Sequence, residues 1–138
     1  MKGKNDARNR QRGAAAVEFA LVLPLFLTLV LGAIDWGWFF FIDQLITNCA
    51  REGARAGTIL APIPTTSAGT AEAAAEKAGR EFLTRVRLAP QGVDATFITV
   101  DGSDAISVTV TYPVGSLTGL LSNVMPANAR ATAVMRWQ

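Results

Sequence analysis

Residues 14–34 decide the fold, and they read AAAVEFALVLPLFLTLVLGAI. A single ionisable group, Glu18, interrupts these twenty-one residues, and the run from Phe19 to Ile34 carries no charge. A helix of this length spans a hydrocarbon core of about 30 Å. Eleven Leu, Ile, Val and Phe side chains in that run contribute about −3 to −7 kcal/mol to insertion, whereas one acid costs about 2.5 to 3.5 kcal/mol even at mid-membrane. The sequence therefore predicts a membrane helix over these residues, called the membrane segment below.

Positive charge is concentrated just before the membrane segment. Residues 1–13 hold five bases and one acid, whereas the remaining chain holds eight bases and ten acids. Lys and Arg beside an apolar span stay in the cytoplasm, so the C-terminal part is expected outside the cytoplasm, with a single pass through the membrane. Because no basic stripe with interleaved aromatic residues occurs elsewhere, nucleic-acid binding is not expected.

The composition of the 138-residue chain argues against catalysis. It has no histidine and one cysteine, Cys49, which excludes a Cys/His zinc cluster, a Ser-His-Asp or Cys-His nucleophile and an intrachain disulfide. Asp94, Asp101 and Asp104 do not have the spacing of an EF-hand loop, and turn chemistry accounts for them. We therefore expect no enzyme, no cofactor and no metal, and an anchored enzyme is the least favoured class.

The junction between the basic leader and the membrane segment carries the sharpest signal. It reads Arg12-Gly13-Ala14-Ala15-Ala16-Val17-Glu18-Phe19, and it resembles the processing site of type IV pilin-like proteins. The resemblance implies that a membrane peptidase cuts after Gly13, leaving a new amine at Ala14. An acid buried in an apolar bundle needs a partner, so Glu18 is expected to register subunits against such an amine. A cleaved signal peptide is the competing interpretation, although its apolar region is usually only about 7 to 15 residues long.

The resemblance extends to a family. Residues 12–25 are similar to the start of TadE-like proteins, the pseudopilins of the tight-adherence (Tad/Flp) pilus system, and Asp35-Trp36-Gly37 and residues 48–55 are similar to later parts of the same region. The resemblance implies a minor pilin-like subunit of the bacterial inner membrane. Its implied partners are a prepilin peptidase, other pilin-like subunits and assembly-platform proteins, within a hetero-oligomer or a filament. The alternative is an unprocessed single-pass scaffold that binds envelope components through its C-terminal part.

The helix is expected to continue from residue 14 to residue 57, about 66 Å at about 1.5 Å per residue, so its second half stands outside the membrane. Aromatic side chains collect at membrane interfaces, and five of them follow the membrane segment at positions 36 and 38–41. Of these, Trp36, Trp38, Phe39 and Phe40 are the predicted interface residues. Cys49 is expected to be a packing residue rather than an intermolecular disulfide partner.

The end of this helix has two further features. Gly53 and Gly57 have the spacing of closely packed helices, but we expect them to end the helix. Arg51 and Arg55 are expected to be solvated or to pair locally with Glu52, with contact to another helix as the alternative.

The remaining chain predicts a small α+β head over residues 70–138. A Pro/Thr-rich linker over residues 58–69 is followed by a helix that Thr70 caps and that ends near Leu88. Its expected inner stripe is Ala71, Ala75, Ala78, Phe82 and Val86, and its expected ion pairs are Glu76 with Arg80 and Glu81 with Arg85. Alternation with a period of two then predicts strands over residues 93–100, 106–112 and 128–137. The predicted organisation is a leader (1–13), a long helix (14–57), the linker and the head, in a pilin-like α+β fold.

Overall fold

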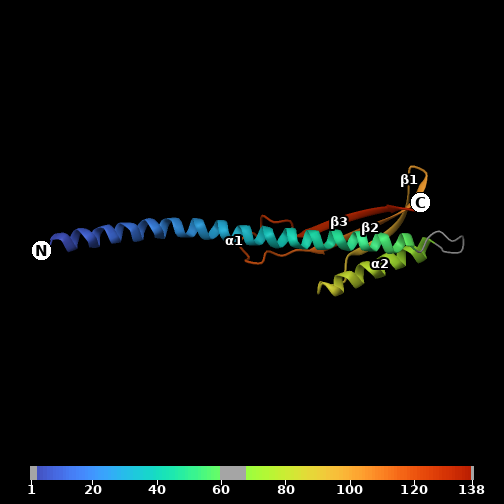
Figure 1. The fold of residues 1–138 in the computed structure, drawn as a ribbon, viewed down its shortest axis with the longest axis horizontal. Coiled ribbons are helices and arrows are strands. Elements are labelled where there is room, and N and C mark those ends of the chain that lie inside the picture. The colour runs from blue at the N-terminus through green and yellow to red at the C-terminus, as the bar shows by residue number, and fades with distance from the viewer. Residues whose placement is uncertain (1–2, 60–67, 138) are drawn as a thin grey trace.

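The computed structural model describes residues 3–59 and 68–137. The elements in chain order are α1 (Gly3–Ile59), α2 (Ala68–Arg85), β1 (Val93–Val100), β2 (Ser103–Pro113) and β3 (Asn128–Arg136). Figure 1 shows that α1 projects far beyond the other elements, which all pack along its C-terminal half. A long apolar helix, a second helix and a three-stranded sheet are the α+β fold that the sequence predicts.

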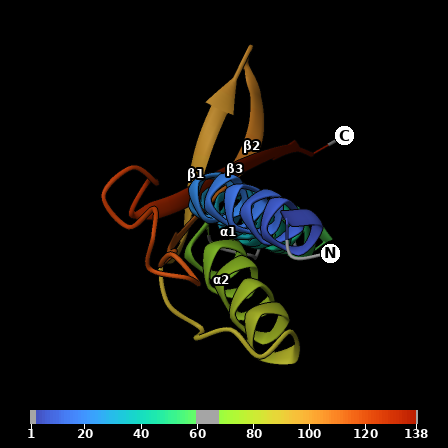
Figure 2. The same cartoon turned by 90° about the vertical axis from the view of Figure 1, so that its left-hand side faces the viewer.

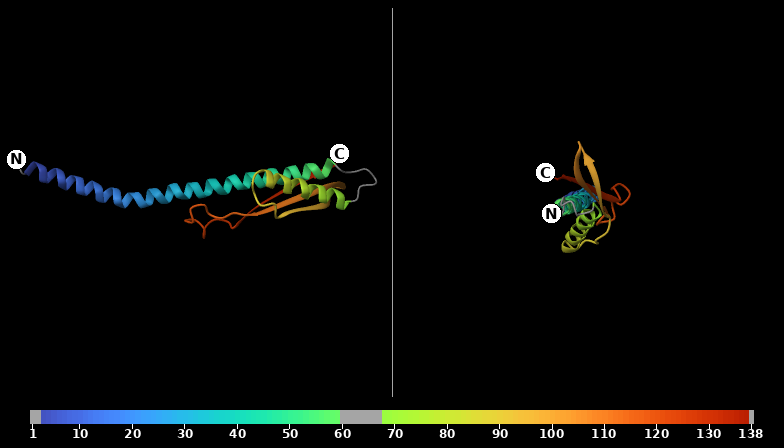
Figure 3. Two further views of the ribbon diagram at one scale, coloured as in Figure 1. Left: turned by 90° about the horizontal axis from the view of Figure 1, so that it is seen from below. Right: turned by 90° about the vertical axis from the view of Figure 1, so that its right-hand side faces the viewer.

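Helix α1 contains 57 residues and is therefore about 85 Å long. It runs without a break through the predicted leader, the membrane segment and the part that carries the head. Pro24 lies inside it, where a proline removes one backbone donor and favours a bend. Figure 3 shows α1 gently bent in its N-terminal half.

The sheet is a meander of three antiparallel strands in the order β1-β2-β3. Phe97 is paired with Ile106 across the first two strands, and Val108 with Ala133 across the last two. Asp101 and Gly102 form the two-residue turn between β1 and β2, with φ angles of 51° and 77°. Positive φ at both positions is the conformation that right-twisted hairpins favour, so the predicted hairpin is confirmed.

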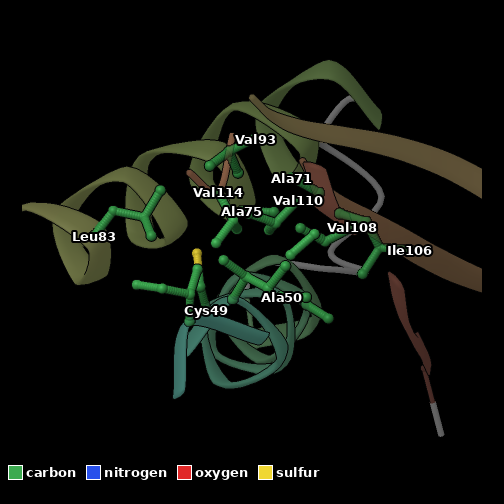
Figure 4. Packing of buried hydrophobic residues seen from close by; sticks show 14 residues of the cluster. Cys49, Ala50, Ala71, Ala75, Leu83, Val93, Ile106, Val108, Val110 and Val114 are labelled. Carbon is green, nitrogen blue, oxygen red and sulfur yellow. The ribbon is translucent and has the colours of Figure 1, made fainter. Parts of the chain in front are cut away.

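Both helices cover the same face of the sheet. Viewed along its length in Figure 2, α1 lies beside α2. Helix α1 packs on β2 and β3, whereas α2 packs mainly on β1. Figure 4 shows the core that they enclose, whose buried residues are Ile42, Ile46, Cys49, Ala50, Ala54, Ala71, Ala75, Leu83, Val93, Ile106, Val108, Val110, Val114 and Ala129. Five of these belong to α1, so the head shares its core with the part of α1 that follows the membrane segment.

The prediction that Gly53 and Gly57 end the helix is wrong, since α1 continues to Ile59. Both glycines are buried where α1 meets α2 and the sheet. A Cβ atom at Gly53 would lie 2.9 Å from the carbonyl oxygen of Ala75, and one at Gly57 would lie 3.1 Å from the Cβ of Ala75. The absence of side chains at these two positions therefore allows the two helices to approach closely.

Helix α2 begins earlier than predicted and turns a slightly different face to the core. It starts at Ala68, so Thr70 lies within its first turn and does not precede the helix as a cap. It ends at Arg85 rather than near Leu88. The fully buried positions are Ala71, Ala75, Gly79 and Leu83. The predicted Ala78, Phe82 and Val86 are only half-buried, because α1 contacts α2 along Ala71, Ala75 and Gly79 instead.

The ion pairs on the outer face of α2 match the prediction in part. The guanidinium of Arg80 lies 3.2 Å from the carboxylate of Glu76, as expected. Glu81 lies 4.0 Å from Lys77 and is not paired with the predicted Arg85 within the described chain. The predicted linker coincides largely with residues 60–67, which lie outside the described residues.

Candidate functional site

The predicted processing junction lies on a free part of α1. Gly13, Ala14 and Glu18 are all exposed on the helix. No atom outside the helix backbone lies within 4 Å of the position that a Cβ at Gly13 would take. Along α1, Gly13 is about 33 Å from Asp35, where the head first contacts the helix through hydrogen bonds. The junction is therefore open to a protein that approaches from the side of the helix.

Most of the membrane segment has no partner within the described chain, and only its last turn lies beside the head. Nearly all of its apolar side chains are exposed, as shown by Leu21 at 75% and Leu29 at 68%. The helix is long and apolar enough to cross a membrane, and its most apolar window is not buried by other residues. A soluble protein does not leave such a continuous apolar surface in water. The exposed apolar helix therefore indicates a single-pass membrane protein.

The four predicted interface aromatics divide into two environments. Trp36 and Phe40 are exposed, and their ring centroids lie 5.8 Å apart. Trp38 and Phe39 are half-buried and pack against the hydrophobic core. Trp36 and Phe40 thus face outward, as an interface belt requires, whereas Trp38 and Phe39 also support the head.

Asp35 joins the end of the membrane segment to the loop between β2 and β3, residues 114–127 (the β2–β3 loop). Its side chain is fully buried. One carboxylate oxygen accepts hydrogen bonds from the hydroxyls of Ser116 and Thr118, both at 2.7 Å, and the other accepts from the backbone N–H of Thr118 at 2.8 Å. A buried carboxylate is stable only when donors satisfy its oxygens. These three donors therefore fix the β2–β3 loop against α1.

Further hydrogen bonds hold the β2–β3 loop in one conformation. Ser116 Oγ also accepts from the N–H of Gly119 at 2.8 Å, and Thr118 Oγ1 accepts from the N–H of Leu120 at 3.3 Å. At the base of the loop, Val114 donates to the carbonyl of Ala127 at 2.9 Å. The Asp35 site is absent from the predicted site residues, because nothing in the local sequence pairs an acid with a loop 80 residues later. Its only local signal is an isolated acid directly after the apolar run.

Arg51, Arg55 and Cys49 lie farther along α1. Arg51 and Arg55 are exposed, and Arg55 lies 3.5 Å from Glu52, which confirms the expected local pair. Cys49 is buried, and its thiol donates a hydrogen bond of 3.2 Å to the carbonyl of Gly79 on α2. Burial raises the pKa of the Cys49 thiol to about 11. It is a packing residue, as predicted.

The acids of the sheet do not gather into a metal site within the described residues. Asp101 instead forms a 2.6 Å ion pair with Arg136. Glu72 of α2 accepts a 2.6 Å hydrogen bond from the backbone N–H of Phe97 on β1, which satisfies an edge-strand donor. Asp101 and Glu72 thus each have a structural partner.

Comparison with known proteins identifies the N-terminal region. Searches of curated proteins and of solved structures gave no match. A family model described as TadE-like protein matches residues 13–55. The match begins at the predicted processing glycine and includes the membrane segment, Asp35-Trp36-Gly37 and both Arg51 and Arg55. The sheet and α2 lie outside it. Residues 13–55, about a third of the chain, are thus similar to the TadE-like family.

Proposed function

We propose that this chain is a minor pilin-like subunit needed for the biogenesis of a Tad/Flp-type pilus, and that a prepilin peptidase processes it after Gly13. The observation that carries the proposal is the TadE-like match that starts at Gly13. Its support is a junction that is exposed and far from the head, preceded by a basic leader that holds it at the cytoplasmic face. The N-terminus is cytoplasmic, and the head stands on the outer side of the inner membrane.

Assembly would use the exposed apolar face of α1. After cleavage, the amine of Ala14 and the carboxylate of Glu18 carry opposite charges about one helical turn apart. Within the described chain, no residue donates a hydrogen bond to Glu18, which is exposed on the helix. In a bundle of pilin-like helices, the Ala14 amine of one subunit would neutralise Glu18 of the next and set their relative height. The other partners are the assembly-platform proteins of the same system.

The test is the intact mass and N-terminal sequence of the protein isolated from membranes, with and without the prepilin peptidase of its host. Processing gives a chain that starts at Ala14 only when the peptidase is present. A chain that starts at Met1 in both strains would contradict the proposal and favour an unprocessed membrane scaffold.

A matched pair of variants sharpens this test. Gly13→Ala should block cleavage, because the peptidase requires an unhindered backbone at that position. The Cβ meets open space within the chain itself, so the loss cannot arise from misfolding. Gly37→Ala is the control, since it also meets open space on α1 and should be processed normally. Normal maturation of Gly13→Ala would contradict the assigned cleavage site.

A further inference from the structure

The β2–β3 loop has a composition that is unusual for an exposed connection. Residues 114–127 contain no charged side chain, although surface loops are normally polar. Three of its large apolar side chains point into solvent: Leu117 is 62% exposed, Leu120 is 47% exposed and Val124 is 70% exposed. The loop is nevertheless ordered by the hydrogen bonds described above. These hydrogen bonds fix the loop in a conformation that exposes its apolar side chains, and the head does not cover them.

The position of the loop indicates what surrounds its exposed apolar side chains. Figures 1 and 3 show the loop beside α1 at the end of the head nearest the N-terminus. Asp35, which anchors it, directly follows the membrane segment. Leu121 reaches still farther, since its Cδ1 atom lies 3.7 Å from the position of a Cβ on Gly32. The loop thus extends alongside the last turn of the membrane segment.

Exposed apolar side chains of α1 continue this surface at the same height. Ile34, Trp36 and Phe40 are 44%, 38% and 58% exposed. If residues 14–34 span the hydrocarbon core, these side chains stand at its outer boundary, where tryptophan is favoured. The loop and α1 therefore both expose apolar side chains at the level where the helix leaves the membrane segment.

We propose that the β2–β3 loop is a second membrane-contacting element, which inserts Leu117, Leu120 and Val124 into the outer leaflet of the bilayer. Asp35 is the positioning residue, because its bonds to Ser116 and Thr118 set the loop at the depth where the helix leaves the membrane. Two attachment points orient the head relative to the bilayer, as a single helix cannot. The inference rests on the membrane insertion of α1 and is independent of processing and of pilus assembly.

The test uses the full chain in phosphatidylcholine–phosphatidylglycerol vesicles, with an environment-sensitive fluorophore on one introduced cysteine at a time. The positions are Leu120→Cys in the loop, Leu27→Cys in the membrane segment and Ser103→Cys at the exposed first residue of β2, at the opposite end of that strand from the loop. Native Cys49 is buried, so a labelling ratio of one fluorophore per chain reports an intact core. Lipids with a spin label high on the acyl chain serve as the quencher.

The proposal expects the fluorophores at positions 120 and 27 to lose most of their emission to the spin-labelled lipids, while the fluorophore at 103 keeps its emission. Asp35→Ala should restore emission at 120 and leave quenching at 27 unchanged. Asp43→Ala is the matched control, because Asp43 is another acid of α1 and no hydrogen bond joins it to the loop within the described residues, so both signals should stay unchanged.

Three results would overturn the proposal in distinguishable ways. Quenching at 27 without quenching at 120 would leave the anchor in place and the loop in water. If emission at position 120 is not quenched by the spin-labelled lipids but changes with the ratio of protein to lipid, the apolar surface of the loop binds a second copy of the chain. Absence of quenching at 27 would remove the membrane anchor itself, and the loop contact with it.

Discussion

Asp35 and Thr118 are 83 residues apart in sequence and are joined by two hydrogen bonds, from the backbone N–H and from the hydroxyl of Thr118. The bonds connect the point where α1 leaves the predicted membrane to a loop at the far end of the chain. Asp35 lies within the residues that match the TadE-like model, whereas Thr118 lies outside them. The region that is similar to TadE-like proteins and the head, which lies outside the match, are therefore joined in one structural unit.

Removal of the Asp35 carboxylate should loosen the β2–β3 loop selectively. In Asp35→Ala, the amides of Thr118, Gly119 and Leu120 should exchange with deuterium roughly tenfold faster, because loss of a charged acceptor leaves the loop donors unpaired. Amides of β2 should retain their protection. Hydrogen exchange followed by mass spectrometry measures both, with Asp43→Ala as the control. Equal exchange in the loops of the two variants would show that Asp35 does not hold it.

The close approach of α1 and α2 should be sensitive to a single methyl group. Gly53→Ala places a Cβ 2.9 Å from a backbone oxygen of Ala75, and such overpacking destabilises proteins by about 1–3 kcal/mol. Gly37→Ala meets open space and should be neutral or stabilising by up to about 1 kcal/mol through helix propensity. Denaturant unfolding in detergent, followed by tryptophan fluorescence, distinguishes them. A Gly53→Ala protein as stable as Gly37→Ala would contradict the packing.

Stability should fall with rising pH because of Cys49. This thiol lies about 22 Å beyond the membrane segment. Burial raises its pKa from 9.0 to about 11. A raised folded-state pKa means that the folded state holds the proton more tightly, so the contribution to stability is complete below pH 9 and is lost as the pH rises through about 11. In Cys49→Ala, the free energy of unfolding should decline less steeply across this pH range than in the unchanged protein. If the free energy of unfolding has the same pH profile in both proteins, the Cys49 thiol does not cause the decline.

Trp137 should stabilise the end of the head farthest from the membrane segment through the hydrogen bond of its indole nitrogen. Its Nε1–H donates to the carbonyl of Thr58 at 3.0 Å, and its ring stacks on Phe97 at a centroid distance of 5.2 Å. Trp137→Phe keeps an aromatic ring and loses the hydrogen bond, which should cost about 0.5–1.5 kcal/mol. Trp36→Phe is the control, because Trp36 is exposed outside the core. Thermal unfolding in detergent compares them, and equal midpoints would contradict a role for this bond.

Glu18 should affect assembly and leave insertion unchanged. Glu18→Ala removes the one charge of the membrane segment, so insertion becomes more favourable, whereas the proposed contact with a neighbouring amine is lost. Glu18→Gln, with the same shape but no charge, should behave like Glu18→Ala. The measurements are the amount of protein in the membrane fraction and the pili recovered by shearing. Normal piliation in both strains would count against registration by Glu18.

Local patterns in the sequence determined the elements of this protein. Twenty-one largely apolar residues require a membrane helix, and alternation with a period of two, broken by Asp101 and Gly102, specifies the hairpin. These features were predictable because each arises from residues within a few positions of one another. The processing junction at Gly13 is inferred from an equally short stretch and stays a prediction. The buried face of α2 was predicted less well. The periodicity of the sequence defines an apolar side of that helix but not the residues that α1 contacts.

Only the tertiary structure decided how distant segments meet. Gly53 and Gly57 carry the same local signal whether they end a helix or pack against one, and the choice depends on Ala75, which belongs to another helix. Asp35 likewise follows an apolar run as an ordinary boundary acid would, and its role arises from Ser116 and Thr118. Because a buried polar group must find its partners wherever the chain brings them, such contacts follow from the packing of the whole chain and not from local sequence.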